Sequence, residues 1–106
     1  MSEEDQRRRY LEEHYILDFA NLAKTRAKRD ELLAIWAASK LGCSDVQAYH
    51  AELRLAGRAV PGDADILQKV LADLRSKGVF LTEGDLQARM NELMFEAAKA
   101  LEAERA

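Results

Sequence analysis

Apolar residues recur every three or four positions along most of the chain, which is the spacing of one face of an α-helix. A two-residue alternation of the kind typical of strands does not persist anywhere in the sequence. The pattern therefore predicts an all-α fold, a four-helix bundle-like domain with a long N-terminal helix. The clearest stripe belongs to the third helix and consists of Ile66, Leu67, Val70, Leu71 and Leu74.

Capping and turn residues divide the pattern into four helical segments. The first is expected over residues 5–41, and the others begin near residues 45, 63 and 83. The boundaries rest on a glycine cap at Gly42, a capping box from Ser44 to Gln47, a helix end near Gly57, a turn at Pro61, Gly62 and Asp63, a glycine cap at Gly78 and an N-cap at Thr82 paired with Asp85.

The first segment differs from the others because its apolar residues fall into two groups. Residues 23–31 lie between the groups and include no large apolar side chain. As a helix this stretch spans about 13 Å, and we expect little of it to face a core. We therefore expect residues 1–22 to form a mobile N-terminal segment and residues 23–106 to form the bundle domain, with Trp36 in its core. An amphipathic segment without an internal partner is a candidate binding element.

Composition narrows the functional classes. The chain has 106 residues, enough for one domain, and its net charge of −3 argues against a generally basic nucleic-acid binder. The basic cluster Lys24, Arg26, Lys28 and Arg29 lacks interleaved aromatic residues, so we read it as a solvated helix face. The longest uncharged stretch, residues 32–39, is too short to span a membrane, and the N-terminus lacks the apolar core of a signal peptide. We expect a cytoplasmic protein.

Residues that could carry chemistry do not form a recognisable site. His14 and His50 have no second ligand at metal-binding spacing. Ser44, His50 and Asp63 are the residue types of a hydrolase triad, but no nucleophile elbow accompanies them. Cys43, the single cysteine, has no identifiable base partner. We expect no catalytic residue, no metal and no cofactor, and hence a protein that is not an enzyme.

Two longer stretches carry a resemblance. Residues 29–42 read RDELLAIWAASKLG, and residues 61–74 read PGDADILQKVLADL. Together, and at this separation, they resemble the alphaproteobacterial DUF1476 family, whose characterised branch is subunit zeta, an inhibitor of the F-type ATP synthase. The resemblance covers about residues 5–101.

The resemblance implies a four-helix domain whose mobile N-terminal helix, residues 3–22 here, wedges into the catalytic head and blocks ATP hydrolysis. Two departures fall in that helix: Arg7, Arg8 and Arg9 make it more basic than is typical, and residues 16–20 make it more apolar. We expect Tyr15 and Phe19, four residues apart, to anchor one helical face. The residues expected to contact the partner are Asp5, Arg7, Glu12, Tyr15, Asp18, Phe19, Leu22 and Lys24.

The sequence hypothesis is thus a regulatory subunit that binds the catalytic head of the F-type ATP synthase. It implies no nucleic-acid partner and no membrane insertion, a monomer when free, and a position peripheral to the inner membrane when bound. Two alternatives remain open. One is a helical adaptor of the same fold without ATPase inhibition, and the other is a small-ligand sensor, for example of a nucleotide, with a pocket between helices.

Overall fold

The fold is all-α, as the sequence predicts. The structure is a computed structural model that describes residues 2–58 and 63–105, and within these residues every regular element is a helix. The turn expected at Pro61 and Gly62 lies outside the described residues. The elements are α1 (Glu3–Leu11), the π-helix η1 (Glu12–Ile16), α2 (Phe19–Leu41), α3 (Val46–Ala56), α4 (Ala64–Ser76) and α5 (Glu83–Arg105).

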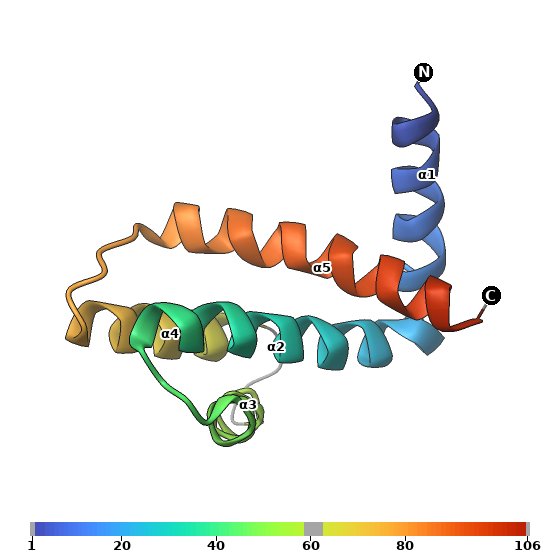
Figure 1. Ribbon diagram of the computed structural model, residues 1–106. Coiled ribbons are helices and arrows are strands. Elements are labelled where there is room, and N and C mark those ends of the chain that lie inside the picture. The colour runs from blue at the N-terminus through green and yellow to red at the C-terminus, as the bar shows by residue number, and fades with distance from the viewer. Residues whose placement is uncertain (1, 59–62, 106) are drawn as a thin grey trace.

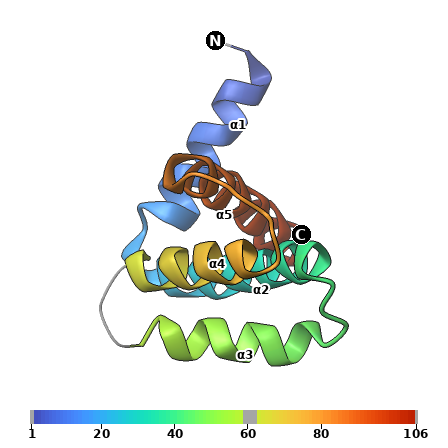
Figure 2. The same ribbon diagram turned by 90° about the vertical axis from the view of Figure 1, so that its left-hand side faces the viewer.

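Four helices, α2 to α5, make up the bundle. The two longest, α2 and α5, pack along each other, and α4 contacts α2, α3 and α5. In both views α3 lies on the side of α2 and α4 that faces away from α5 (Figures 1 and 2). Helix α1 stands out from the opposite side, and among the described helices of the bundle it contacts α5, near the C-terminal end of that helix (Figure 1).

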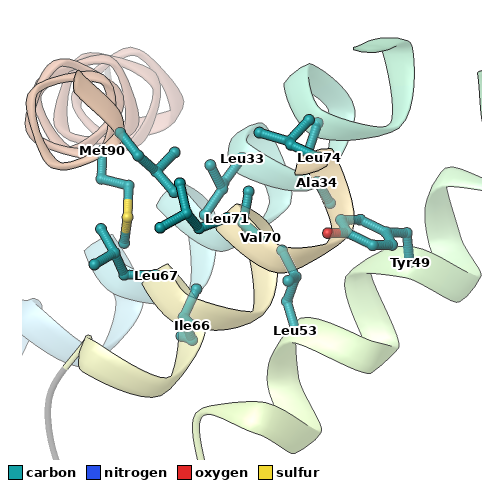
Figure 3. Close-up of a cluster of buried hydrophobic side chains, with 12 residues drawn as sticks. Leu33, Ala34, Tyr49, Leu53, Ile66, Leu67, Val70, Leu71, Leu74 and Met90 are labelled. Atoms are coloured by element: carbon teal, nitrogen blue, oxygen red, sulfur yellow. The ribbon is translucent and has the colours of Figure 1, made fainter. Parts of the chain in front are cut away.

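The core of the bundle forms around α4. All five residues of the predicted α4 stripe are buried, which confirms that prediction, and α4 thereby contributes side chains toward α2, α3 and α5 (Figure 3). The buried cluster consists of Leu33, Ala34, Ala37, Tyr49, Leu53, Ile66, Leu67, Val70, Leu71, Leu74, Leu86 and Met90.

Several helix ends lie where the sequence predicts them. Gly42 and Gly78 both have positive φ, 70° and 79°, a conformation that glycine adopts without the steric cost of a side chain. Thr82 caps α5, because its Oγ1 accepts a hydrogen bond from the Asp85 amide at 3.0 Å. These local signals depend only on residues close in sequence, which is why the sequence alone identifies them.

The start of α3 and the place of Trp36 differ from expectation. Asp45, and not Ser44, caps α3 by accepting a hydrogen bond from the Ala48 amide at 3.0 Å. Trp36 is only partly buried and lies at the edge of the core, with the cationic groups of Lys40 and Arg89 near its ring. The expectation of a core tryptophan is therefore wrong. The indole instead covers the core edge under two amphipathic side chains.

The expected continuous helix over residues 5–41 is interrupted at Leu17 and Asp18. The Leu17 amide donates to the Glu12 carbonyl at 2.7 Å and closes the π-helical turn. Asp18 then adopts an extended conformation, with φ −77° and ψ 112°, and its side chain accepts from the Ala20 amide at 3.0 Å. Asp18 is thus the N-cap of a new helix, since a carboxylate there satisfies an amide that has no partner within the helix.

The polar stretch 23–31 is packed into the structure, contrary to expectation. Thr25, Arg29 and Asp30 are all buried. The Arg29 guanidinium donates to Asp63 through Nη2 at 2.8 Å and to Asp30 through Nε at 2.7 Å, and Arg26 donates to Asp63 at 2.6 Å. Polar residues can line a helix interface when their charges are paired in this way. Two cations of the predicted basic face are therefore bound to a carboxylate of the same chain.

The two arginines change the pKa of the Asp63 carboxyl. Partial burial acts to raise the pKa of its carboxyl, but the hydrogen bonds and positive charges of Arg29 and Arg26 outweigh burial and hold that pKa below its ordinary value. The ion pairs join the start of α4 to α2 across 34 residues of chain for Arg29 and 37 for Arg26.

Candidate functional site

The part of the molecule that stands out from the bundle is the N-terminal arm, defined here as residues 2–17. Side chains 2–10 are all exposed, and α1 contacts only η1 and α5 among the described elements. Ser2 caps α1 by accepting a hydrogen bond from the Asp5 amide at 3.1 Å. Glu3, Glu4 and Asp5 lie in the first turn and Arg8 and Arg9 in the last, which matches the helix dipole at both ends.

Polar side chains of α2 hold the base of the arm. The Asn21 side-chain amide donates to the His14 carbonyl at 2.8 Å. The buried Thr25 hydroxyl donates to the Tyr15 carbonyl at 2.8 Å. A π-helical turn leaves carbonyls without regular α-helical partners, and these two side chains satisfy them. The base of the arm is therefore fixed to α2 even though the helix is interrupted.

The apolar face of the arm rests on the C-terminal half of α5. Leu11 is 1% exposed and Tyr15 is 2% exposed, and both pack with the buried Ala98. Phe95 and Leu101 border this second cluster, which shares no residue with the bundle core. The expectation that the arm lacks an internal partner is therefore wrong. Helix α5 extends beyond the bundle core and offers the arm an apolar surface of its own.

Hydrogen bonds between polar side chains add to the same contact between the arm and α5. The Tyr15 hydroxyl donates to the Glu102 carboxylate, and the Tyr10 hydroxyl donates to the same carboxylate at 3.5 Å. Arg105 approaches the Tyr15 hydroxyl at 3.4 Å. The hydrogen bond to Glu102, together with burial, raises the pKa of Tyr15 above its ordinary value of 10.0. Tyr15 is therefore neutral at physiological pH and acts as a hydrogen-bond donor.

A cleft of about 420 Å³ lies between α1 and α5 beside this cluster. Its walls combine acidic, basic and apolar side chains, and the guanidinium of Arg8 lies 3.7 Å from the centroid of the Phe95 ring. Such stacking of a cation on an aromatic face is attractive. The cleft is lined by Glu3, Glu4, Arg7, Arg8, Leu11, Phe95 and Lys99.

The residues expected to contact a partner fall into two groups. Asp5, Arg7, Glu12, Phe19 and Lys24 are exposed, and Arg7 lines the cleft between α1 and α5. The others face the protein: Tyr15 is buried, Asp18 caps α2 and Leu22 is partly buried.

The expected aromatic pair does not form one face. The helix ends between Tyr15 and Phe19, so their spacing of four residues no longer places them together. Tyr15 points into the α5 contact, whereas Phe19 is 92% exposed at the first position of α2.

Sequence reasoning missed the α5 side of this site. The signal was present, because Phe95, Ala98 and Leu101 recur at helical spacing and Leu11 and Tyr15 match them in the arm. Their pairing could not be read from the sequence, since about 90 residues separate the two sides.

Two further observations concern metal ions and membranes. Residues 2–58 and 63–105 contain no group of three or more His, Cys, Asp or Glu side chains placed to hold a metal ion. Among the same residues, no helix combines the length and the apolar character that crossing a membrane requires.

Comparison with known proteins identifies the family. No curated protein matches the chain. A family model described as ATPase inhibitor subunit zeta matches residues 1–100, and thus spans the arm, the interruption at Leu17 and Asp18, and almost all of the bundle. The chain therefore belongs to the ATPase inhibitor subunit zeta family, and this membership supports the role of a regulatory inhibitor rather than that of an enzyme.

Proposed function

We propose that this protein inhibits ATP hydrolysis by an F-type ATP synthase by inserting its N-terminal arm, together with the first turn of α2, into the catalytic head. The bundle formed by α2 to α5 would remain outside and carry the arm. The family assignment supports an inhibitory role, and the shape of the molecule supports the arm as the part that acts.

One observation carries the proposal: the arm is a capped helix that projects from the bundle with residues 2–10 exposed (Figure 2). A helix presented in this way can enter a groove without any rearrangement of the bundle core, because that core includes no residue of α1 or η1. Helix-in-groove binding is a common mode of recognition between proteins.

Selective binding explains how such a helix stops a motor. A rotary catalytic head passes through states of different shape, and a helix that binds one state more tightly than the others shifts the population toward that state. Leu17, at the base of the arm, and Phe19, at the first position of α2, are 69% and 92% exposed. They are free to enter an apolar pocket of the partner, where buried aromatic residues commonly supply much of the binding energy.

Truncation tests the proposal. Deleting residues 2–17 keeps Asp18, and therefore keeps the N-cap of α2. The truncated protein should fold, because the bundle core lies outside the arm, and it should lose inhibition of ATP hydrolysis by the cognate enzyme. Circular dichroism checks the fold and an ATPase assay checks inhibition. Inhibition by the truncated protein equal to that of the full chain would refute the proposal.

A point substitution with a matched control locates the contact. Phe19→Asp should weaken inhibition by about 30-fold or more if Phe19 is an anchor. Phe80→Asp is the control, because Phe80 is also exposed, at 77%, but lies in the α4–α5 connector far along the chain from the arm. Both changes should alter the free energy of unfolding by less than about 0.5 kcal/mol. Equal effects on inhibition would show that Phe19 is not a specific anchor. A full chain that binds a protein but does not inhibit would favour the adaptor alternative.

A further inference from the structure

The apolar residues of the arm that are best suited to bind a partner already contact another surface of the same molecule. Leu11 and Tyr15 are the buried apolar residues of the arm, and both face α5. A helix that enters a groove binds mainly through its apolar face. In this arrangement that face is already covered.

The covering surface combines apolar packing with a specific polar contact. Ala98 is completely buried beneath the arm, and its small side chain allows the two helices to approach closely. Glu102 accepts hydrogen bonds from both Tyr10 and Tyr15. Hydrogen bonds to a charged acceptor are stronger than those between neutral groups. The contact therefore combines buried apolar packing with specific hydrogen bonds, which is the composition of a docking site.

The contact is also separable from the rest of the fold. The cluster around Leu11 and Tyr15 shares no member with the bundle core, so the arm can leave α5 without opening that core. The interruption at Leu17 and Asp18 supplies a place where the backbone can change direction, since α2 carries its own N-cap there. Opening at this place also releases the hydrogen bonds that the Asn21 and Thr25 side chains donate to the arm, while the bundle core stays closed. Local opening of this kind costs less than global unfolding.

We propose that the distal face of α5, formed by Phe95, Ala98, Leu101 and Glu102, is an internal docking site that holds the N-terminal arm in an autoinhibited, closed state. The partner and α5 compete for the same face of the arm. The regulatory consequence rests on the proposed function, because the competing partner is the catalytic head. Inhibitory potency is then set by the fraction of molecules in which the arm is open.

The size of the effect follows from that fraction. The apparent dissociation constant equals the intrinsic one divided by the open fraction. For an open fraction of about 1–10%, complete release of the arm raises potency by about 10- to 100-fold. A mutation on α5 that weakens docking should therefore make the protein a stronger inhibitor, although it changes no residue of the arm.

Two variants on α5 test the proposal, and neither alters the inserted segment. Glu102→Ala removes the acceptor of both tyrosine hydroxyls, and Ala98→Asp places a carboxylate in the buried contact. Glu92→Ala is the matched control, because it removes one carboxylate from the same helix at an exposed position outside the contact. If Ala98→Asp disturbs the bundle, Glu102→Ala still provides the test.

Two measurements are made on each full-length protein. Hydrogen exchange of the free protein should be about tenfold faster over residues 3–16 in the Glu102→Ala variant than in the wild type or the Glu92→Ala control, with residues 64–76 unchanged. The concentration for half-maximal inhibition of ATP hydrolysis by the cognate enzyme should fall by up to about tenfold in the same variant.

The outcomes separate the two claims. Unchanged exchange over residues 3–16 in both α5 variants would overturn the internal docking site, whatever the inhibition. Faster exchange with unchanged or weaker inhibition would overturn the autoinhibitory role of the contact. Faster exchange in a protein that never inhibits, with or without the α5 change, would overturn the proposed function and, with it, the competition with the catalytic head.

Discussion

Arg29 shows how one residue can give a polar stretch a structural role. Its guanidinium is 2% exposed and is shared between Asp30 and Asp63. Burial acts to lower the pKa of Arg29, but the hydrogen bonds that its guanidinium donates to Asp63 and the charges of both carboxylates outweigh burial and raise it. A buried cation whose donors are satisfied specifies one arrangement of its neighbours, because loss of either partner leaves an uncompensated charge. Here it sets the position of the α4 start on α2.

The Asp63→Asn variant tests this role through its pH dependence. It should lower the free energy of unfolding at pH 7 by about 2–3 kcal/mol, less than for a wholly buried pair because Asp63 is partly exposed and Asp30 still pairs with Arg29. The pKa of Asp63 is lower in the folded protein than its ordinary value of 3.8, so its contribution is fully present above that value and is lost as pH falls through the folded pKa.

The difference in unfolding free energy between wild type and Asp63→Asn should therefore shrink as the pH falls below about 3.8. Urea unfolding at a series of pH values measures this difference, and contributions from other carboxylates cancel in it. A difference that stays constant over the whole range would contradict the assigned role of the Asp63 carboxylate.

At the scale of helices, Asp18 sets the boundary between the arm and α2. An aspartate just before a helix is a strong N-cap, and its extended backbone interrupts what would otherwise continue from η1 into α2. The arm therefore has its own direction relative to α2, and its base is held by the side chains of Asn21 and Thr25.

Replacing Asp18 with Ala should cost about 0.5–2 kcal/mol of folding free energy, because the Ala20 amide loses its acceptor. Hydrogen exchange of the first amides of α2 should become faster. Glu13→Ala is a suitable control, since Glu13 is an exposed acidic residue of the arm, and its loss should change the unfolding free energy by less than about 0.5 kcal/mol. An Asp18→Ala protein as stable as wild type would show that the cap does not stabilise α2.

The helices themselves could be predicted largely from the sequence because their signals are local. The stripe of α4, the glycine caps and the Thr82 cap each depend on residues within about one turn. The interruption at Asp18 could also have been identified, since its N-cap signal is local, but the helical spacing of apolar residues on both sides concealed it.

The candidate site could be predicted only in part because its contacts are not local. The burial of Arg29 depends on Asp63, which is 34 residues away, and the burial of Tyr15 depends on Glu102, which is 87 residues away. One sequence does not show such pairings. The arm could be located as the candidate element, but which of its residues face α5 and which face solvent required the structure.

At the scale of the whole molecule, the bundle and the arm are separate structural parts. The bundle has a core of its own, and the arm contacts it through a second, smaller cluster at the end of α5. The two parts can therefore change their relation without loss of the fold. We propose that this separation allows the arm to leave its contact with α5 and bind the catalytic head. The mobility expected for residues 1–22 would then be the movement of the arm between these two contacts.

Site-specific photo-cross-linking during ATP hydrolysis tests insertion of the arm most directly. A photoreactive side chain replaces Arg9, which is exposed on α1, and in a matched control it replaces Arg54, which is exposed on α3. Each protein is irradiated with the cognate F-type ATP synthase while ATP is hydrolysed, and mass spectrometry identifies the cross-linked subunit. We predict that position 9 cross-links to the catalytic subunits and that position 54 does not. Cross-links to the catalytic subunits from position 54, with none from position 9, would contradict insertion of the arm.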